Sequence, residues 1–171
     1  ISLFTCLGSL AQTNPKIESD ENCNAFSFRL HRDNYLLIEK YNREPNLRPY
    51  APYLYLAQGA DLTSNEVAFQ LSFKIKFIDN MLGSPLDLWG GYTQQSFWQA
   101  YNGKSSRPFR ETNYQPEVMV VLPIHFNMPG VTVRFISFGL EHQSNGMLVL
   151  FSRSWNRIYG ELSLKTGYLE L

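Results

Sequence analysis

The sequence lacks an excess of charge of either sign, because 15 Lys and Arg residues are balanced by 15 Asp and Glu residues. A nucleic-acid-binding surface usually shows as a basic excess, so we expect no nucleic-acid partner. The sequence also lacks a run of about 18 apolar residues, which argues against a membrane-spanning helix. Strands that cross a membrane alternate in polarity and leave no such run, so a transmembrane β-barrel stays open.

Cysteine is scarce as well, with only Cys6 and Cys23 in the chain. Residues 1–11 are apolar and then small, and we interpret them as a signal-peptide remnant cleaved near Ala11 or Gln12. A short buried strand is the alternative for this segment. Cys6 would leave with the signal, so we predict no structural disulfide. Residues 12–24 are polar and aperiodic, and we expect a flexible lead-in to one domain over residues 25–171.

Aromatic residues and alternating polarity are abundant instead. Aromatic residues make up 15% of the chain, and residues 66–77 alternate strictly between apolar and polar. Further strands are expected near residues 35–41, 88–101, 117–126, 131–142 and 154–164. No apolar helical stripe competes, so we predict an all-β, antiparallel fold of about six or seven strands. Several strands exceed the five or six residues usual in a sandwich, which favours a transmembrane barrel. Pro123 would then require a bulge or an unpaired position.

Three residues able to act together lie near the ends of two neighbouring expected strands. Alternate residues of a strand point to the same face, so His142 and Ser144 share one face. Asn156 lies on the apolar face of the next strand. In an antiparallel hairpin joined by the 145–153 loop, Asn156 would lie beside His142. The charged faces of both strands should line a polar interior, and the apolar faces should meet lipid.

These three residue types suit nucleophilic catalysis on an ester. In a serine hydrolase, a histidine removes the serine proton and a third group fixes the imidazole tautomer. On the outer wall of a barrel, such a triad suits a substrate dissolved in the membrane. Taken alone, a His-x-Ser pair is more often an ordinary pair of exposed polar residues, and Asn156 is equally compatible with the end of a loop.

Several separate segments of the chain share the motifs of one known family. They are His142-Gln143-Ser144-Asn145-Gly146, Ser152-Arg153-Ser154-Trp155-Asn156-Arg157, Tyr92-Thr93-Gln94-Gln95-Ser96-Phe97-Trp98-Gln99, residues 108–117 and residues 65–72. Through these segments, the chain resembles the bacterial outer-membrane phospholipase A family over roughly residues 33–165.

The resemblance implies a twelve-stranded antiparallel barrel in the bacterial outer membrane, active as a calcium-dependent homodimer that hydrolyses acyl esters of phospholipids. It implies Ser144 as nucleophile, His142 as general base and Asn156 as the residue that orients the base. The backbone N–H of Gly146 would stabilise the oxyanion. The remaining roles implied are calcium binding by Ser106, Met147 and Ser152, and a dimer contact at Gln94.

Two features depart from the family pattern. The 147–151 loop is apolar where the family has a polar turn. The chain also ends after about half the expected strands, so we expect an N-terminal fragment of a member. These departures leave a non-catalytic or decayed barrel with a structural or porin-like role as the alternative. A soluble β-sandwich that binds a ligand through exposed aromatic residues is a third hypothesis.

Overall fold

The computed structural model describes residues 25–44, 62–105, 108–147, 152–166 and 169–170. The expected signal remnant, the lead-in, both cysteines, Ser106 and residues 148–151 lie outside this part of the chain. Over the described ranges, no helix is both long enough and apolar enough to span a membrane.

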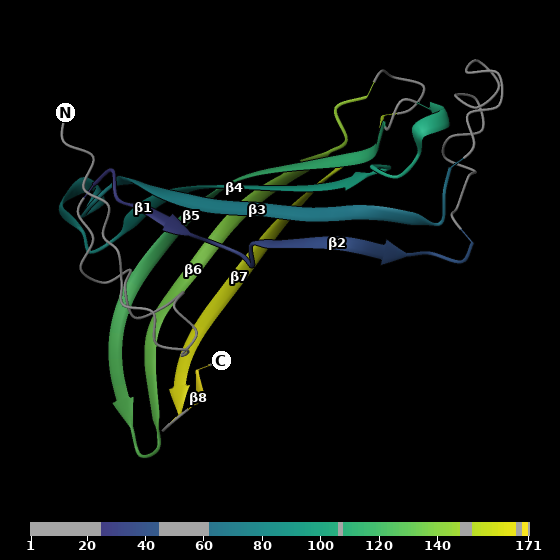
Figure 1. Ribbon diagram of the computed structural model, residues 1–171. Helices are drawn as coiled ribbons and strands as arrows, with labels where there is room; N and C mark the ends of the chain where they lie inside the picture. The colour runs from purple at the N-terminus through teal and green to yellow at the C-terminus, as the bar shows by residue number, and fades with distance from the viewer. Residues whose placement is uncertain (1–24, 45–61, 106–107, 148–151, 167–168, 171) are drawn as a thin grey trace.

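The described residues form one antiparallel sheet. Its order is β1-β3-β4-β5-β6-β7-β8, and β2 also pairs with β3. Figure 1 shows this sheet strongly curved, with β5, β6 and β7 sweeping away from β3 and β4. The all-β antiparallel prediction is confirmed. The strands are β1 Phe28–Leu30, β2 Tyr35–Tyr41, β3 Asn65–Ile78, β4 Asp87–Trp98, β5 Phe109–Met128, β6 Val131–Ser144, β7 Ser154–Thr166 and β8 Leu169–Glu170, with short 3-10 turns η2 Met81–Gly83 and η3 Gly103–Ser105.

The predicted strand positions agree with the structure except at some ends. The strand expected at 35–41 has those bounds, and the one expected at 66–77 extends by one residue at each end. The strand expected from residue 117 begins earlier, at Phe109, and runs through Pro116. The short strands β1 and β8 were not predicted, because so few residues carry no alternation to detect.

Two adjacent bulges lie near the β5–β6 hairpin. The bulge predicted at Pro123 is confirmed, because the β5–β6 register shifts between Pro123 and Phe126. A second shift, against β7, falls between Val133 and Phe135. Because an extra residue in a strand reverses the parity beyond it, simple alternation does not hold across this point of β6.

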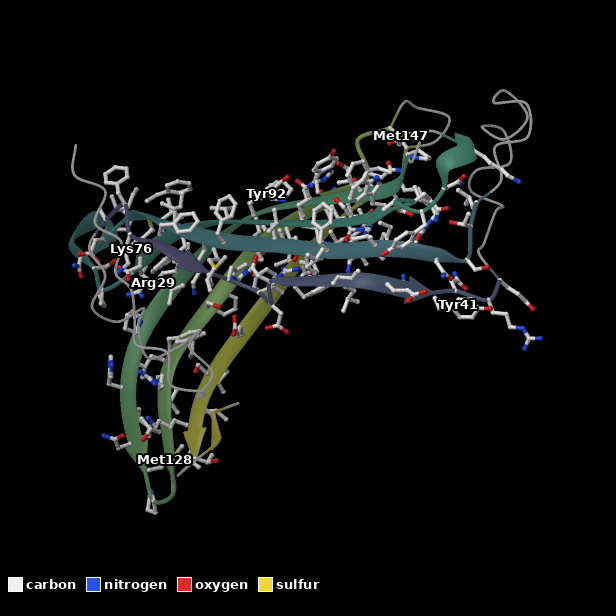
Figure 2. The ribbon with its side chains drawn as sticks, in the orientation of Figure 1. Arg29, Tyr41, Lys76, Tyr92, Met128 and Met147 are labelled. Carbon is white, nitrogen blue, oxygen red and sulfur yellow. The ribbon has the colours of Figure 1, made fainter. Side chains whose placement is uncertain are left out.

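The two faces of the sheet differ in polarity. One face buries charged side chains, and the other exposes large apolar ones (Figure 2). This arrangement is the reverse of a water-soluble sheet and is typical of a barrel with a polar interior and a lipid-facing wall. We call them the inner face, which includes Lys76, Asp87, Glu117 and Glu141, and the outer wall, which includes Leu71, Val118, Phe138, Leu140, Ile158 and Leu162.

A break separates β1 from β2, which both pair with β3. Residues 31–34 lie opposite residues 71–72, between the paired residues Leu30–Phe73 and Tyr35–Gln70. The Asn34 side chain bridges the break: its Nδ2 donates to the Ser72 carbonyl at 3.0 Å, and its Oδ1 accepts from the Ser72 N–H at 2.7 Å. The backbone thereby bulges at residues 31–34 without losing its attachment to β3.

Candidate active site

His142 and Asn156 meet across the β6–β7 ladder, where they are paired residues. The distance between His142 Nδ1 and Asn156 Oδ1 is 2.7 Å. Because an amide oxygen only accepts, Nδ1 must carry the proton and donate it, and Nε2 is then left with its lone pair. The predicted proximity of Asn156 and His142 is confirmed, and the arrangement leaves an imidazole nitrogen able to act as a base.

Ser144 lies two residues beyond His142 on β6 and is half-buried. Alternate residues of a strand lie about 6.5 Å apart and point to the same face. Among the described residues, no hydrogen bond joins Ser144 to the His142 ring. In serine hydrolases without a bound substrate this contact is often long and tightens in the complex. Ser144 is therefore placed on the correct face for transfer of its proton to His142.

The surroundings of these three residues are apolar. Leu140 precedes His142 on the same face, and its cross-strand partner Ile158 is 80% exposed. On the other side Val118 pairs with Leu140 and is also exposed. A polar triad thus adjoins an apolar wall, where a long acyl chain would be compatible with the neighbouring side chains.

A tight turn follows Ser144. Gly146 has φ +63°, a left-handed conformation, and a Cβ there would lie 3.0 Å from Tyr114 Cε2. Asn145 is buried and closes the loop: its N–H donates to the Arg153 carbonyl at 3.1 Å, and its Oδ1 accepts from the Arg153 N–H at 2.9 Å. Met147 and Ser152 therefore lie at the two ends of a loop that Asn145 holds closed.

Two of the three expected calcium ligands, the Met147 carbonyl and the Ser152 hydroxyl, are oxygen atoms of this loop. Ser152 and Met147 are both exposed, while Ser106 lies outside the described residues. Within the described part of the chain, no group of three or more His, Cys, Asp or Glu side chains could hold a metal. Hydroxyl and backbone carbonyl oxygens are nevertheless ligands that Ca²⁺ accepts. The residue types at the ends of the loop are thus compatible with this ion.

Gln94, the expected dimer contact, lies in a polar strip of the outer wall. It pairs with Leu71 on β3 and with Tyr114 on β5. The Tyr92 hydroxyl donates to Gln94 Oε1 at 3.0 Å, and Gln94 Nε2 donates to Ser96 Oγ at 3.2 Å. Tyr114 pairs in turn with Ser144. Gln94 and the candidate nucleophile therefore lie on the same wall, separated by one strand.

The sequence did not indicate the charged cluster behind the triad. On the inner face, Glu141 accepts hydrogen bonds from both Arg157 and Arg32. The pairing of Glu141 with Arg157 follows from the same parity as the pairing of His142 with Asn156 and could have been found from it. Arg32 is 109 residues away from Glu141 and gave no comparable signal.

Comparison with known proteins identifies relatives. A family described as Phospholipase A1 matches residues 12–171. A phospholipase A1 of Klebsiella pneumoniae is 39% identical over 144 residues, which cover 84% of this chain and 49% of that protein. The chain spans between 38% and 50% of the length of the curated relatives that it matches.

Solved structures show the same fold. The outer-membrane phospholipase of Salmonella typhi, solved as a dimer with bound calcium, aligns with a TM-score of 0.72 and 35% identity, covering 84% of this chain and 55% of that one. An active-site Asn-to-Ala mutant of outer membrane phospholipase A from Escherichia coli aligns with a TM-score of 0.72 and 34% identity, covering 86% and 56%. The expected outer-membrane β-barrel class and location are confirmed.

Proposed function

This chain belongs to the phospholipase A1 family, and from that premise we propose that it carries the catalytic residues of a calcium-dependent phospholipase of the bacterial outer membrane. The substrates would be the acyl esters of membrane phospholipids. The observation that carries the proposal is the hydrogen bond between His142 Nδ1 and Asn156 Oδ1 on the lipid-facing wall, with Ser144 on the same face. A hydrolase acting on a soluble substrate would gain nothing from this position.

The chain's own residues supply each proton transfer. His142 Nε2 removes the hydroxyl proton of Ser144 while Oγ forms a bond to the ester carbonyl carbon. The protonated imidazole then gives its proton to the leaving alkoxide as the ester bond breaks. Water, deprotonated by His142 in the same way, releases the fatty acid from the acyl-Ser144 ester. Asn156 holds the imidazole in the tautomer that these steps need.

The negative charge that develops on the carbonyl oxygen needs donors. The left-handed turn at Gly146 directly follows Ser144, and its backbone N–H is the proposed donor. When bound, calcium would add positive charge near this oxygen. Ser152, the Met147 carbonyl and Ser106 are the proposed oxygen ligands. The closure of the loop by Asn145 supports the first two, because it brings the loop ends together.

We further propose that the active form is a homodimer with Gln94 at the contact. The Gln94 amide bonds Tyr92 and Ser96 but keeps a second N–H and a second lone pair, and a second copy presenting the same wall would satisfy them. The dimer of the Salmonella typhi relative supports this arrangement. Crosslinking of a Gln94→Cys variant in micelles should increase when calcium is added. Crosslinking that does not change with calcium would contradict the proposed dimer.

The direct test is covalent labelling of Ser144. The full-length protein in detergent with calcium should react with a long-chain sulfonyl fluoride, and it should release fatty acid from phospholipid micelles. Ser144→Ala should abolish the labelling and reduce hydrolysis by at least about a thousand-fold. Ser154→Ala, which removes a hydroxyl at the paired position on β7, is the matched control and should retain activity within a few-fold. An unlabelled folded wild type would instead favour a non-catalytic barrel.

A further inference from the structure

The backbone ladder between β5 and β6 is interrupted beside His142. Paired residues occur at Tyr114–Ser144 and at Glu117–Glu141, with two unpaired positions between them. In this register Pro116 lies opposite His142, and both missing pairs would require an N–H on Pro116, which proline lacks. The His142 carbonyl therefore receives no hydrogen bond from β5.

Side chains on the inner face bridge this gap. Gln115 Nε2 donates to Gln143 Oε1 at 2.9 Å. The Arg32 guanidinium, in the bulge between β1 and β2, donates to Gln115 Oε1 at 2.8 Å, to Glu141 Oε2 at 2.8 Å and to Glu117 Oε1 at 3.1 Å. Figure 1 shows the link between β1 and β2 dipping towards the strands that carry these residues. One side chain thus joins β5 and β6 on either side of the interruption.

The same cluster ties β6 to β7. Arg157 Nε donates to Glu141 Oε2 at 3.0 Å, and the pair Glu141–Arg157 adjoins the pair His142–Asn156. The side chains of Glu117 and Glu141 are 0% and 1% exposed and that of Arg32 is 28% exposed, so the ion pairs of Arg32 are partly buried and only weakly screened. A shift of the β6 register by one residue would move Glu141 to the outer wall and His142 to the inner face. The ion pairs of Glu141 oppose this shift because it would break them.

We propose that Arg32 is a positioning residue for ester hydrolysis. Together with Gln115, Gln143 and Glu141 it replaces the ladder that Pro116 interrupts, and it holds His142 and Ser144 in reacting geometry. The inference rests on the proposed function. These four side chains lie on the inner face, opposite the wall that meets the substrate, so they act through the strand. Displacement of a reacting group by about 1 Å can cost roughly a hundred-fold in rate.

The experiment uses the full-length protein in detergent micelles with calcium. It measures kcat, KM and the rate of Ser144 labelling by a sulfonyl fluoride, each per folded molecule as judged by heat-modifiable gel mobility. Arg32→Gln removes the bridge, and Gln115→Ala breaks it without leaving an unpaired charge, so it decides the question if Arg32→Gln does not fold. Lys76→Gln is the control: it removes an inner-face cation whose partners, Asp79 and Asp87, lie outside β6.

Arg32→Gln and Gln115→Ala should lower kcat and the labelling rate by about ten- to a hundred-fold, with KM within about two-fold. Lys76→Gln should lower the folded fraction but not kcat per folded molecule. Adding Pro116→Ala supplies the missing N–H, so in that background the loss caused by Arg32→Gln should shrink to within about three-fold.

Equal kcat losses in Arg32→Gln and Lys76→Gln, with a labelled wild type, would overturn this inference and leave the proposed function standing. A loss in Arg32→Gln that Pro116→Ala leaves undiminished would overturn the replacement of the ladder. An unlabelled wild type would overturn the proposed function itself, and this inference with it.

Discussion

The inner and outer faces of β6 and β7 come from the same two strands but are opposite in polarity and in burial. The inner face buries the carboxylate of Glu141, which pairs with Arg157, whereas the outer face exposes Phe138, Leu140 and Ile158. In water this arrangement would be costly on both sides, because burial penalises charge and exposure penalises apolar area. The contrast shows that lipid is the solvent of the outer wall.

The exceptions on that wall are the residues to which we assign catalysis. His142, Ser144 and Asn156 have the outer parity yet are polar. Polar groups that face lipid are expensive and are retained where chemistry needs them. On the inner face, by contrast, polarity is ordinary and signals stability rather than reactivity.

The largest effect is expected from a charge on the outer wall. Leu162 lies near the middle of β7 and is 51% exposed. Leu162→Lys should lower the free energy of unfolding by about 2–4 kcal/mol, because it places an ammonium in lipid. Urea unfolding in lipid vesicles, followed by tryptophan fluorescence, measures it. Glu161→Lys changes charge on the inner face and should cost less than about 1 kcal/mol. Equal costs would contradict the assignment of the faces.

A smaller effect, on the catalytic rate, is expected from replacing Asn156, one of the polar residues of the outer wall. Asn156→Ala should lower kcat by about ten- to a hundred-fold, roughly 1.4–2.7 kcal/mol, because the imidazole loses the acceptor that fixes its tautomer. KM should change little. Asn156→Asp keeps an acceptor and should recover most of the rate. Steady-state hydrolysis of phospholipid micelles provides both constants, and an unchanged kcat in Asn156→Ala would remove this residue from the triad.

Two glycines on opposite faces of β6 and β7 are covered differently. On the inner face Tyr159 lies over Gly139, its partner across the strands, and donates to Glu117 Oε2 at 2.7 Å. On the outer wall a Cβ added at Gly160 would lie 3.4 Å from Phe138 Cε1, an ordinary contact distance. Gly139→Ala should therefore destabilise by about 1–3 kcal/mol by displacing Tyr159.

Gly160→Ala is the matched control for that substitution. Its added methyl group would meet Phe138 at contact distance, so the cost should stay below about 1 kcal/mol. Thermal loss of the folded gel band compares the two variants. A larger loss of stability in Gly160→Ala than in Gly139→Ala would contradict this prediction.

The smallest effect is expected at a turn that belongs to neither face. The hydrogen bond from Lys76 lowers the pKa of Asp79, which follows β3. Because this pKa is depressed on folding, the ionised Asp79 stabilises the fold at pH values above the unfolded pKa of 3.8. This stabilisation is lost as the pH falls through the lower pKa of the folded state. Asp79→Asn should remove this acid sensitivity, worth below about 1 kcal/mol because water screens the pair. Thermal scans at neutral and strongly acidic pH test it, and identical pH dependence in both proteins would contradict it.

Much of the fold and part of the site could be predicted from alternation alone. Parity placed His142 and Ser144 on one face, and a simple hairpin brought Asn156 beside His142, because both facts are local to two adjacent strands. Alternation alone does not extend past Arg134, where a bulge changes parity without any proline or glycine to mark it.

Contacts between distant segments could not be predicted. The interaction of Arg32 with Glu141 depends on the bulge between β1 and β2 and on sheet curvature, and neither has a local pattern. The start of β5 at Phe109 was also not predicted, and this strand runs through Pro116. The sheet accommodates that proline because its missing N–H faces a position that side chains bridge instead.

The Asn34 side chain shows how the edge of the sheet can continue across the break between β1 and β2. A peptide group offers one donor and one acceptor at fixed spacing, and the Asn34 carboxamide presents the same two groups to Ser72. It therefore acts as a peptide surrogate, so the first strand can carry extra residues without a gap in the edge. Asp at this position would keep the acceptor but meet the Ser72 carbonyl with a second acceptor, and Ala would offer neither group. The tolerance of the edge for inserted residues thus depends on this amide, together with the bonds from the Arg32 N–H to Ser72 Oγ and from Gln70 Nε2 to the Asp33 carbonyl.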